Sequence, residues 1–354
     1  MNRFDQTLYL EDIVAVARLP LPWNRLKGRR LLVSGATGMV GTFLLDVLAW
    51  RNGETQLDCK VTALTRNKER AQARAVPAWE SCVRFLECDV NHSIPALDGT
   101  VDYVIHAASN THPVAYATDP IGTITTNIIG TRNMLEAAAE SGASRVVFVS
   151  SVEIYGENRG DCERFDEQYC GYLDCNTLRA GYPEGKRAGE ALCQAYIRQK
   201  GLDIVIPRLP RIYGPTMLES DTKAISQFIK KGVAGEDIVL KSAGNQLYSY
   251  SCVADAVSGI LYCLFFGRNG EAYNVADPGS DVTLKQLAEM IAAYFGKQVV
   301  FELPDAVEQA GYSKATKALM DGQKLKQLGW SASCEIVDGL SRCLKTMQAL
   351  RSSS

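Results

Sequence analysis

The sequence predicts an α/β protein with a doubly wound parallel sheet, followed by a smaller mixed α/β region. Two observations lead to this prediction. Over the first 210 residues, short apolar runs alternate with segments of helical periodicity, and a glycine-rich turn follows the first apolar run. Alternation of this kind places helices on both faces of a parallel sheet. After residue 210 the alternation becomes irregular, which marks the second region.

Each apolar run of the first region predicts a strand, and each periodic stretch predicts a helix. The expected strands are 30–34, 60–64, 83–86, 103–106, 146–150 and 204–206. The expected helices between them are 40–50, 67–74, 127–140 and 187–199. In the second region the periodicity predicts helices at 222–231 and 284–295.

The glycine turn, Gly35-Ala36-Thr37-Gly38-Met39-Val40-Gly41, lies between the first strand and the first helix. In such a turn the first glycine permits the tight bend, the second lets backbone amides approach a pyrophosphate, and the third lets the helix sit close to the strand. The helix N-terminus adds partial positive charge for phosphates. The predicted sheet is therefore of the Rossmann type, and Gly35, Thr37, Gly38, Met39, Val40 and Gly41 are predicted to bind a dinucleotide.

The end of the second strand, Leu64-Thr65-Arg66-Asn67, lacks the acid that would hold a ribose 2′-hydroxyl. Arg66 can pair with a 2′-phosphate or stack on an adenine, and it can equally be a solvated arginine, so both NAD and NADP stay open. Asp89, with Val90 beside it, follows the third strand and is a candidate to accept from an adenine amino group. Ala107 and Ala108, after the fourth strand, are small enough to let a cofactor cross the sheet edge.

Tyr182 and Lys186 are spaced by four residues, which puts both side chains on one face of a helix. A free tyrosine titrates near pH 10, and a neighbouring ammonium stabilises its anion. An isolated match of this kind is most often a solvated pair. Together with the glycine turn and with Ser150 and Ser151, however, it predicts a nicotinamide-dependent enzyme that moves a hydride and a proton at a carbinol carbon.

Composition narrows the class of protein. The 354 residues are 46% hydrophobic and 22% charged with a net charge of -2, which is typical of a soluble globular enzyme and gives no basic face for nucleic acid. No apolar run approaches the roughly 18 residues of a membrane span, and the N-terminus lacks a signal-peptide layout. Eleven scattered cysteines fit reduced thiols in a cytoplasm, and with three histidines and no Cys-x-x-Cys pair, no metal site is predicted.

The chain is similar to the extended short-chain dehydrogenase/reductases, the nucleotide-sugar epimerase and dehydratase group, from about residue 27 to 340. The matching elements are the glycine turn, Ile105-His106-Ala107-Ala108, Thr126-Asn127 with Ile129-Gly130-Thr131, residues 149–156, Tyr182 to Lys186, Tyr213-Gly214-Pro215 and Leu328-Gly329-Trp330. Residues 179–187 look most like UDP-glucuronate decarboxylases.

This resemblance implies a division of roles. Tyr182 would be the general acid/base, Lys186 would hold the nicotinamide ribose and lower the tyrosine pKa, and Ser151 would hydrogen-bond the reacting oxygen. Glu153 is either a second acid/base or only a helix-cap acid. Asn127 is expected to support the catalytic helix. Val149 is added to the expected cofactor contacts and Ser109 to the expected substrate contacts.

Two departures from the family pattern concern the substrate side. Tyr248 stands where the family usually places an arginine, and Arg211 stands where an asparagine is usual. Both are predicted substrate-binding residues. The missing cation has either moved to Arg211, which would then meet the substrate phosphates, or Arg211 forms an internal ion pair.

Three functions stay open on the sequence. The first is an epimerase, dehydratase or decarboxylase that oxidises a nucleotide-diphosphate sugar transiently. The second is an NADPH-dependent reductase that converts a nucleotide-linked ketose to an alditol. The third is a cofactor-binding regulator with a dead site, against which the intact Ser151, Tyr182 and Lys186 argue. Family members commonly pair through the helices expected at 127–140 and 187–199, so a homodimer is expected.

The expected domain organisation follows from these assignments. Residues 1–27 form an N-terminal extension with a weakly helical stretch at 8–18 that packs on the outside of the sheet. Residues 28–210 form the NAD(P)-binding domain, to which 247–270 return because 251–266 is too apolar for a surface excursion. Residues 211–246 and 271–354 form the substrate-binding region.

Overall fold

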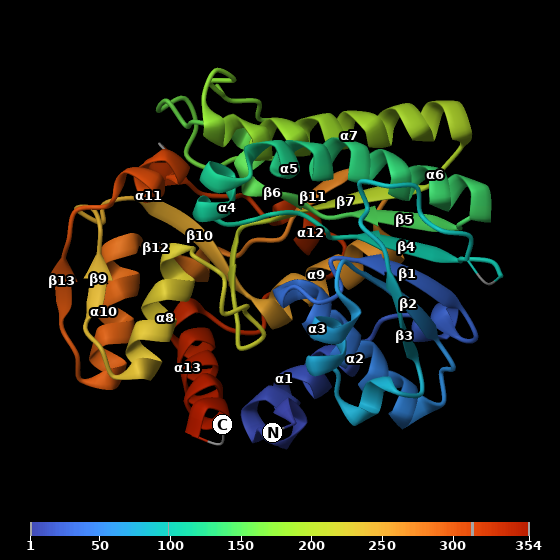
Figure 1. Ribbon diagram of the computed structural model, residues 1–354, viewed down its shortest axis with the longest axis horizontal. Coiled ribbons are helices and arrows are strands. Elements are labelled where there is room, and N and C mark those ends of the chain that lie inside the picture. The colour runs from blue at the N-terminus through green and yellow to red at the C-terminus, as the bar shows by residue number, and fades with distance from the viewer. Residues whose placement is uncertain (1, 98, 313–314, 353–354) are drawn as a thin grey trace.

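Seven strands of the protein lie side by side in one parallel sheet, in the order β11-β7-β5-β4-β1-β2-β3 (Figure 1). The structure is a computed structural model that describes residues 2–97, 99–312 and 315–352. The strands of this sheet are β1 (Arg30–Ser34), β2 (Lys60–Thr65), β3 (Val83–Glu87), β4 (Tyr103–His106), β5 (Arg145–Phe148), β7 (Ile204–Leu209) and β11 (Ala272–Asn274), with the short β6 (Ser150–Ser151) beside β7. All six strands expected from the sequence form within one or two residues of their predicted bounds, except that the run 146–150 divides into β5 and β6 and β7 extends to Leu209.

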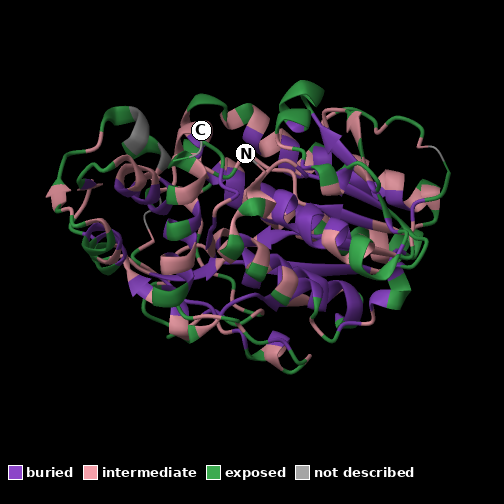
Figure 2. Ribbon diagram, turned by 90° about the horizontal axis from the view of Figure 1, so that it is seen from below, coloured by how far each residue is buried: buried purple, intermediate pink, exposed green. Residues whose placement is uncertain are grey.

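The central strands are buried along nearly their whole length because helices cover both faces of the sheet. One layer contains α5 (Pro120–Thr125), α6 (Thr131–Ser141) and α7 (Gly181–Lys200); the other contains α1 (Thr7–Ala17), α2 (Met39–Thr55), α3 (Lys68–Ala73) and α9 (Val253–Phe266) (Figure 1). Figure 2 shows the result as buried strands and inner helix faces with exposed residues outside. Within the described residues, no helix combines the length and apolarity needed to cross a bilayer.

The smaller region has its own sheet, in which β10 is the central strand. Its strands are β8 (Arg211–Tyr213), β10 (Leu247–Cys252), β12 (Asp281–Thr283) and β14 (Lys317–Ala318), and a separate pair is formed by β9 (Ile238–Leu240) and β13 (Val299–Phe301). Its helices are α8 (Ala224–Ala234), α10 (Leu284–Phe295), α11 (Ala306–Gly311) and α13 (Ile336–Ser352). Helix α12 (Gln323–Lys326) packs on β11 and α9 of the large domain, and α4 (Pro113–Thr118) precedes α5. The fold is thus α/β with a parallel Rossmann-like sheet and a smaller mixed sheet, as predicted.

The boundary between the two regions differs from the prediction for 247–270. Strand β10 does not join the large sheet, because it pairs with β8, which has already left that sheet after β7. Only α9, whose residues are almost all buried, returns to the large sheet. In exchange β11, which the prediction placed in the substrate region, pairs with β7 at the sheet edge.

Two helices of the first region also have other bounds than the sequence predicts. Helix α7 begins at Gly181, six residues before the expected start, and it accommodates Pro183 in its first turn, where no intrahelical N–H is needed. The stretch expected as one helix at 127–140 begins as a π-helical segment, Thr126–Gly130, that continues α5 into α6.

The N-terminal extension is part of the large domain's core. Helix α1 packs on α2 and α9 through Tyr9, Ile13, Val16 and Ala17, so its main contacts are with the helices that cover this face of the sheet. Just before α1, Arg3 forms two hydrogen bonds of 2.6 Å with the carboxylate of Asp46, which is fully buried on α2. Trp79 donates to the same carboxylate at 2.8 Å, and Tyr9 also bonds it.

We expect Arg3→Ala to destabilise the protein by about 3–5 kcal/mol, because it leaves the buried charge of Asp46 without its cation. Urea unfolding followed by circular dichroism measures this loss. Arg18→Ala, which removes a solvent-exposed partner of Glu54, is the matched control and should leave the unfolding midpoint nearly unchanged. Equal midpoints in all three proteins would show that Asp46 does not need Arg3.

Candidate functional site

A cavity of about 390 Å³ lies at the carboxyl ends of the central strands, where β1, β2, β4 and β6 end. This is the edge at which doubly wound sheets bind ligands. It is lined by every predicted site residue except Tyr248: Gly35, Thr37, Gly38, Met39, Val40, Gly41, Arg66, Asp89, Val90, Ala107, Ala108, Ser109, Val149, Ser151, Glu153, Tyr182, Lys186 and Arg211. Residues from segments far apart in the chain therefore meet at one cavity.

The glycine turn brings backbone close to backbone at the floor of this cavity. Gly35 has a φ of +69°, and a Cβ there would lie 2.5 Å from the carbonyl group of Ala107. A Cβ on Gly41 would lie 2.2 Å from the carbonyl oxygen of Gly35. Helix α2 begins immediately after Gly38 without a side-chain cap, so its first-turn amides have neither intrahelical nor side-chain acceptors. These features fit the pyrophosphate of a dinucleotide.

Two charged residues stand at the far edge of the cavity. Arg66 is exposed directly after β2, and Asp89 follows β3 with a carboxylate that accepts the N–H of Asn91 at 2.9 Å. Val90 is buried beside them, and its side chain packs against Gly130, where a Cβ would come within 2.8 Å.

Tyr182 is buried in the cavity wall, stacked on Tyr116 with ring centroids 5.1 Å apart. Burial raises the pKa of Tyr182 to about 12, and the charge of Glu153 raises it as well. A hydrogen bond with Ser151 and the charge of Arg179 act in the opposite direction. The phenol is therefore protonated at neutral pH, with Ser151 as its immediate polar neighbour.

Lys186 lies one turn further along α7 and is almost fully buried. Its ammonium donates to the carbonyl oxygen of Val149 at 2.8 Å and lies 4.9 Å from the centroid of the Phe148 ring. Burial lowers its pKa to about 8, and the carboxylate of Glu190 opposes that shift. The group accordingly stays cationic at neutral pH.

Glu153 follows Ser151 in a 3-10 turn and is held by two arginines, Arg179 at 2.7 Å and Arg211 at 3.5 Å. Burial alone would raise its pKa, but the two guanidinium groups outweigh that and hold the pKa below its usual value. Glu153 is thus an ionised carboxylate in this structure. This favours a role as a fixed negative charge over a role as a general acid.

Arg211 forms the internal ion pair that the sequence left as one of two alternatives. Its guanidinium also lies 3.4 Å above the ring of Tyr248. The Tyr248 hydroxyl donates to the carbonyl of Ala315 at 2.7 Å, and its ring is covered, so the side chain does not line the cavity. Arg211 keeps one buried nitrogen, Nη1, for which no hydrogen-bond partner exists among the described residues.

Buried polar groups connect the segments behind the cavity. The side-chain oxygen of Asn127 accepts from Ser109 at 2.9 Å, and its amide donates to the carbonyl of Thr123 at 2.8 Å. His106 lies between Ser34 (2.6 Å) and Thr131 (3.1 Å), and burial lowers its pKa to about 3, so this histidine is neutral and structural.

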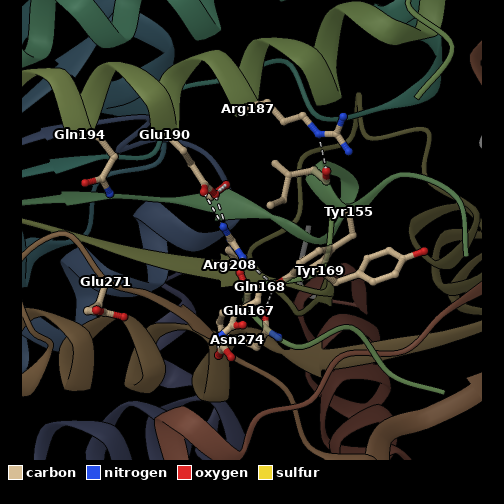
Figure 3. A network of polar contacts seen from close by, with 12 residues as sticks. Tyr155, Glu167, Gln168, Tyr169, Arg187, Glu190, Gln194, Arg208, Glu271 and Asn274 are labelled. Carbon is tan, nitrogen blue, oxygen red and sulfur yellow. Dashed lines mark hydrogen bonds and ion pairs between the residues drawn. The ribbon is translucent and has the colours of Figure 1, made fainter. Parts of the chain in front are cut away.

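A second network fixes α7 from behind (Figure 3). Glu190, four residues after Lys186, accepts from Arg208 at 2.6 Å and 3.0 Å and from Ser150 at 2.6 Å. Arg208 donates further to Tyr155, whose hydroxyl bonds Asn274 at 2.6 Å. The network joins α7, β7 and β11, so the position of Lys186 is tied to the large sheet.

Sequence reasoning missed part of the cavity wall. Tyr116 and His112 line it from α4 and the residue before it, and Leu218, Ser220, Asp221 and Lys223 line it from the loop before α8. The imidazole of His112 lies 3.2 Å from the hydroxyl of Thr222, which connects these two segments. The loop carries no motif. Arg179 does not line the cavity but pairs with Glu153, and it could have been found because it lies in the stretch that resembles decarboxylases.

Comparison with known proteins gives a consistent family assignment. The model of the NAD dependent epimerase/dehydratase family matches residues 31–276. UDP-glucuronic acid decarboxylase 3 of Arabidopsis thaliana is 30% identical over 312 residues, which cover 88% of this chain and 86% of the relative. UDP-glucuronic acid decarboxylase 1 of Xenopus tropicalis is 30% identical over 321 residues, covering 89% and 71%.

Solved structures share the fold. The dTDP-glucose 4,6-dehydratase DesIV of Streptomyces venezuelae, solved with NAD, is 25% identical with a TM-score of 0.74 and covers 92% of this chain and 98% of its own. UDP-glucose 4-epimerase of Thermotoga maritima, solved with UDP-glucose, is 21% identical with a TM-score of 0.76 and covers 92% and 100%.

We expect Glu190→Gln to lower the pKa of Lys186 below about 8, because the carboxylate that opposes the desolvation of the ammonium is lost. The ammonium would then deprotonate at lower pH. Nitrogen-detected NMR titration of labelled lysine side chains measures this, with the resonance assigned from Lys186→Arg. Glu184→Gln, on the same helix and paired with Arg187, is the control. An unchanged Lys186 titration in Glu190→Gln would show that Glu190 acts only through packing.

Proposed function

Because the chain belongs to the NAD dependent epimerase/dehydratase family, we propose that it binds a nicotinamide dinucleotide and a nucleotide-diphosphate sugar in the cavity. We propose further that it oxidises one carbinol carbon of the sugar transiently while an epimerisation, dehydration or decarboxylation takes place. One observation carries this proposal: the glycine turn with the α2 N-terminus and the Ser151, Tyr182, Lys186 cluster line the same cavity.

The residues present suit such a cofactor. Gly35 and Gly41 leave no room for a Cβ and so keep the turn close to α2 and the sheet, and the uncapped first turn of α2 offers amide donors to phosphate. The nicotinamide supplies hydride acceptance and return when it is bound. Lys186, fixed by Val149 and Glu190, would hold the ribose next to Tyr182.

The chain's own groups supply the proton chemistry. Ser151 and Tyr182 would both hydrogen-bond the oxygen of the reacting carbon, and Tyr182 would take and return its proton. Glu153, held as a carboxylate by Arg179 and Arg211, would orient the sugar or stabilise positive charge beside it.

Arg66 favours a second candidate, net reduction of a nucleotide-linked ketose with NADPH. It is a cation at the cavity edge where an acid would select NAD, and it can pair with a 2′-phosphate. A dead regulator is disfavoured because Ser151, Tyr182 and Lys186 meet in one cavity.

A panel of nucleotide sugars and nucleotide-linked ketoses, incubated with NAD or NADPH and analysed by mass, tests the proposal. Retained mass with a changed sugar indicates epimerisation, loss of water dehydration, loss of carbon dioxide decarboxylation, and gain of two hydrogens reduction. Binding of neither cofactor, with no product from any substrate, would contradict both candidates.

With the substrate and cofactor for which the panel shows activity, we expect Tyr182→Phe to lower turnover by about 100-fold or more, which is the scale for removing a positioned acid/base. Cofactor affinity and melting temperature should stay close to wild type, because the ring and its stacking on Tyr116 are kept. Steady-state kinetics beside cofactor titration measures both. Wild-type turnover would remove Tyr182 from the mechanism.

Arg211 supplies a test of the substrate side. If its unpartnered Nη1 serves a phosphate or another anionic group of the substrate, Arg211→Ala should raise KM for every nucleotide-linked substrate with little effect on cofactor affinity. A lost buried charge contact costs on the order of 2–5 kcal/mol. Arg159→Ala, at an exposed arginine, is the control. Normal KM together with a lowered melting temperature would support a purely internal ion pair.

A further inference from the structure

A cluster outside the cavity brings together two thiols and a carboxylate. Cys252 ends β10 and caps α9, Asp255 lies in the first turn of α9, and Cys334 lies in the segment that leads into α13. One ligand atom from each lies within 4.8 Å of the other two. The two sulfurs are 3.7 Å apart, and the Cys334 sulfur is 3.9 Å from Oδ2 of Asp255.

These separations suit a single tetrahedral ion. With zinc–sulfur bonds of about 2.3 Å and zinc–oxygen bonds of about 2.0–2.2 Å, two sulfur ligands are roughly 3.8 Å apart and a sulfur and an oxygen roughly 3.5 Å. The observed distances need only small adjustments of the side chains to reach these values. Two thiolates with a carboxylate are also donors that a borderline-soft cation such as zinc prefers.

The surrounding hydrogen bonds already orient the three ligands. Oδ1 of Asp255 accepts the backbone N–H of Ser333 at 2.7 Å, so Oδ2 is left toward the sulfurs. The N–H of Asp255 donates to the Cys252 sulfur at 3.4 Å. Outer contacts of this kind fix the direction of metal ligands, and the positive N-terminal end of the 14-residue α9 favours anions at this position.

The carboxylate of Asp255 also differs from the neighbouring carboxylate of Asp12. Asp12 accepts a hydrogen bond of 2.7 Å from Arg342 and so has its own cationic partner. Asp255 is buried, and the two cysteine residues are partly exposed.

We propose that Cys252, Asp255 and Cys334 bind one thiophilic divalent cation, for which zinc is the best match, with water in the fourth position. Binding releases the two thiol protons to solvent. The ion would fasten the segment before α13 to the N-terminus of α9, at the point where β10 passes into that helix. Cys334 is 82 positions from Cys252, so no short ligand spacing indicates this site in the sequence.

The test is titration of the reduced, chelator-treated full chain with Co²⁺ and then Zn²⁺. We expect one equivalent of Co²⁺ to give a thiolate-to-metal absorption band with the visible bands of tetrahedral cobalt, and Zn²⁺ to displace it. Cys252→Ser, Cys334→Ser and Asp255→Asn should each weaken binding by at least about 10–100-fold, the loss that even an outer contact causes. Cys170→Ser, at an exposed cysteine outside the cluster, should bind like wild type.

Zn²⁺ should also raise the melting temperature of wild type and of Cys170→Ser but not of Cys334→Ser, since a ligand stabilises the state that binds it. Absence of a one-equivalent cobalt complex in wild type, or a complex without the thiolate band, overturns the proposal without any variant. A reduced protein that binds no metal but forms a Cys252–Cys334 disulfide with peroxide, read as a loss of two hydrogens in that peptide pair, would overturn it in favour of a redox pair.

Discussion

The arrangement of the site depends on keeping one ammonium charged inside the protein. Lys186 is nearly inaccessible to water, and a buried ammonium without compensation loses its proton. The carbonyl of Val149, the face of the Phe148 ring and the carboxylate of Glu190 supply that compensation. Glu190 is itself mostly buried, so it in turn requires the guanidinium of Arg208. The charge of Lys186 is therefore maintained by a network that crosses from α7 to β7 and β11.

Such a network works only if α7 lies very close to the sheet. Glycines provide this approach. A Cβ on Gly189 would lie 2.5 Å from the ring of Phe148 on β5, and one on Gly185 would lie 2.8 Å from the Cβ of Asn127 on the neighbouring helical segment. The glycine turn uses the same device on the other side of the cavity, where Gly35 and Gly41 bring α2 against the ends of β1 and β4. Close packing at these four glycines thus positions α7 and α2 on either side of the cavity.

What the sequence predicts well is local. The glycine turn and the Tyr182 and Lys186 spacing each lie in one short segment, and each strand or helix of the alternating pattern is read from its own short run. These elements form where they were expected, within the differences in bounds given above. What it does not predict is which distant segments meet. The partners of Glu153 lie 26 and 58 positions away, at Arg179 and Arg211. The pairing of β10 with β8 depends on the path of the chain after β7, and a propensity argument cannot see that path.

The pKa of Tyr182 shows how these constraints meet at the reacting position. Burial raises it to about 12, so with only the chain's own groups around it the phenol is a proton donor. Glu153 raises it further, and because Arg179 and Arg211 keep that carboxylate ionised, this contribution is constant near neutral pH. An additional positive charge close to the ring would lower this pKa and favour the phenolate. An oxidised, cationic nicotinamide in the same cavity would add such a charge, whereas the reduced, neutral form would not. In the proposed function, the proton affinity of Tyr182 would in this way be coupled to the oxidation state of a bound nicotinamide, and such coupling would let one side chain accept a proton during oxidation and return it during reduction.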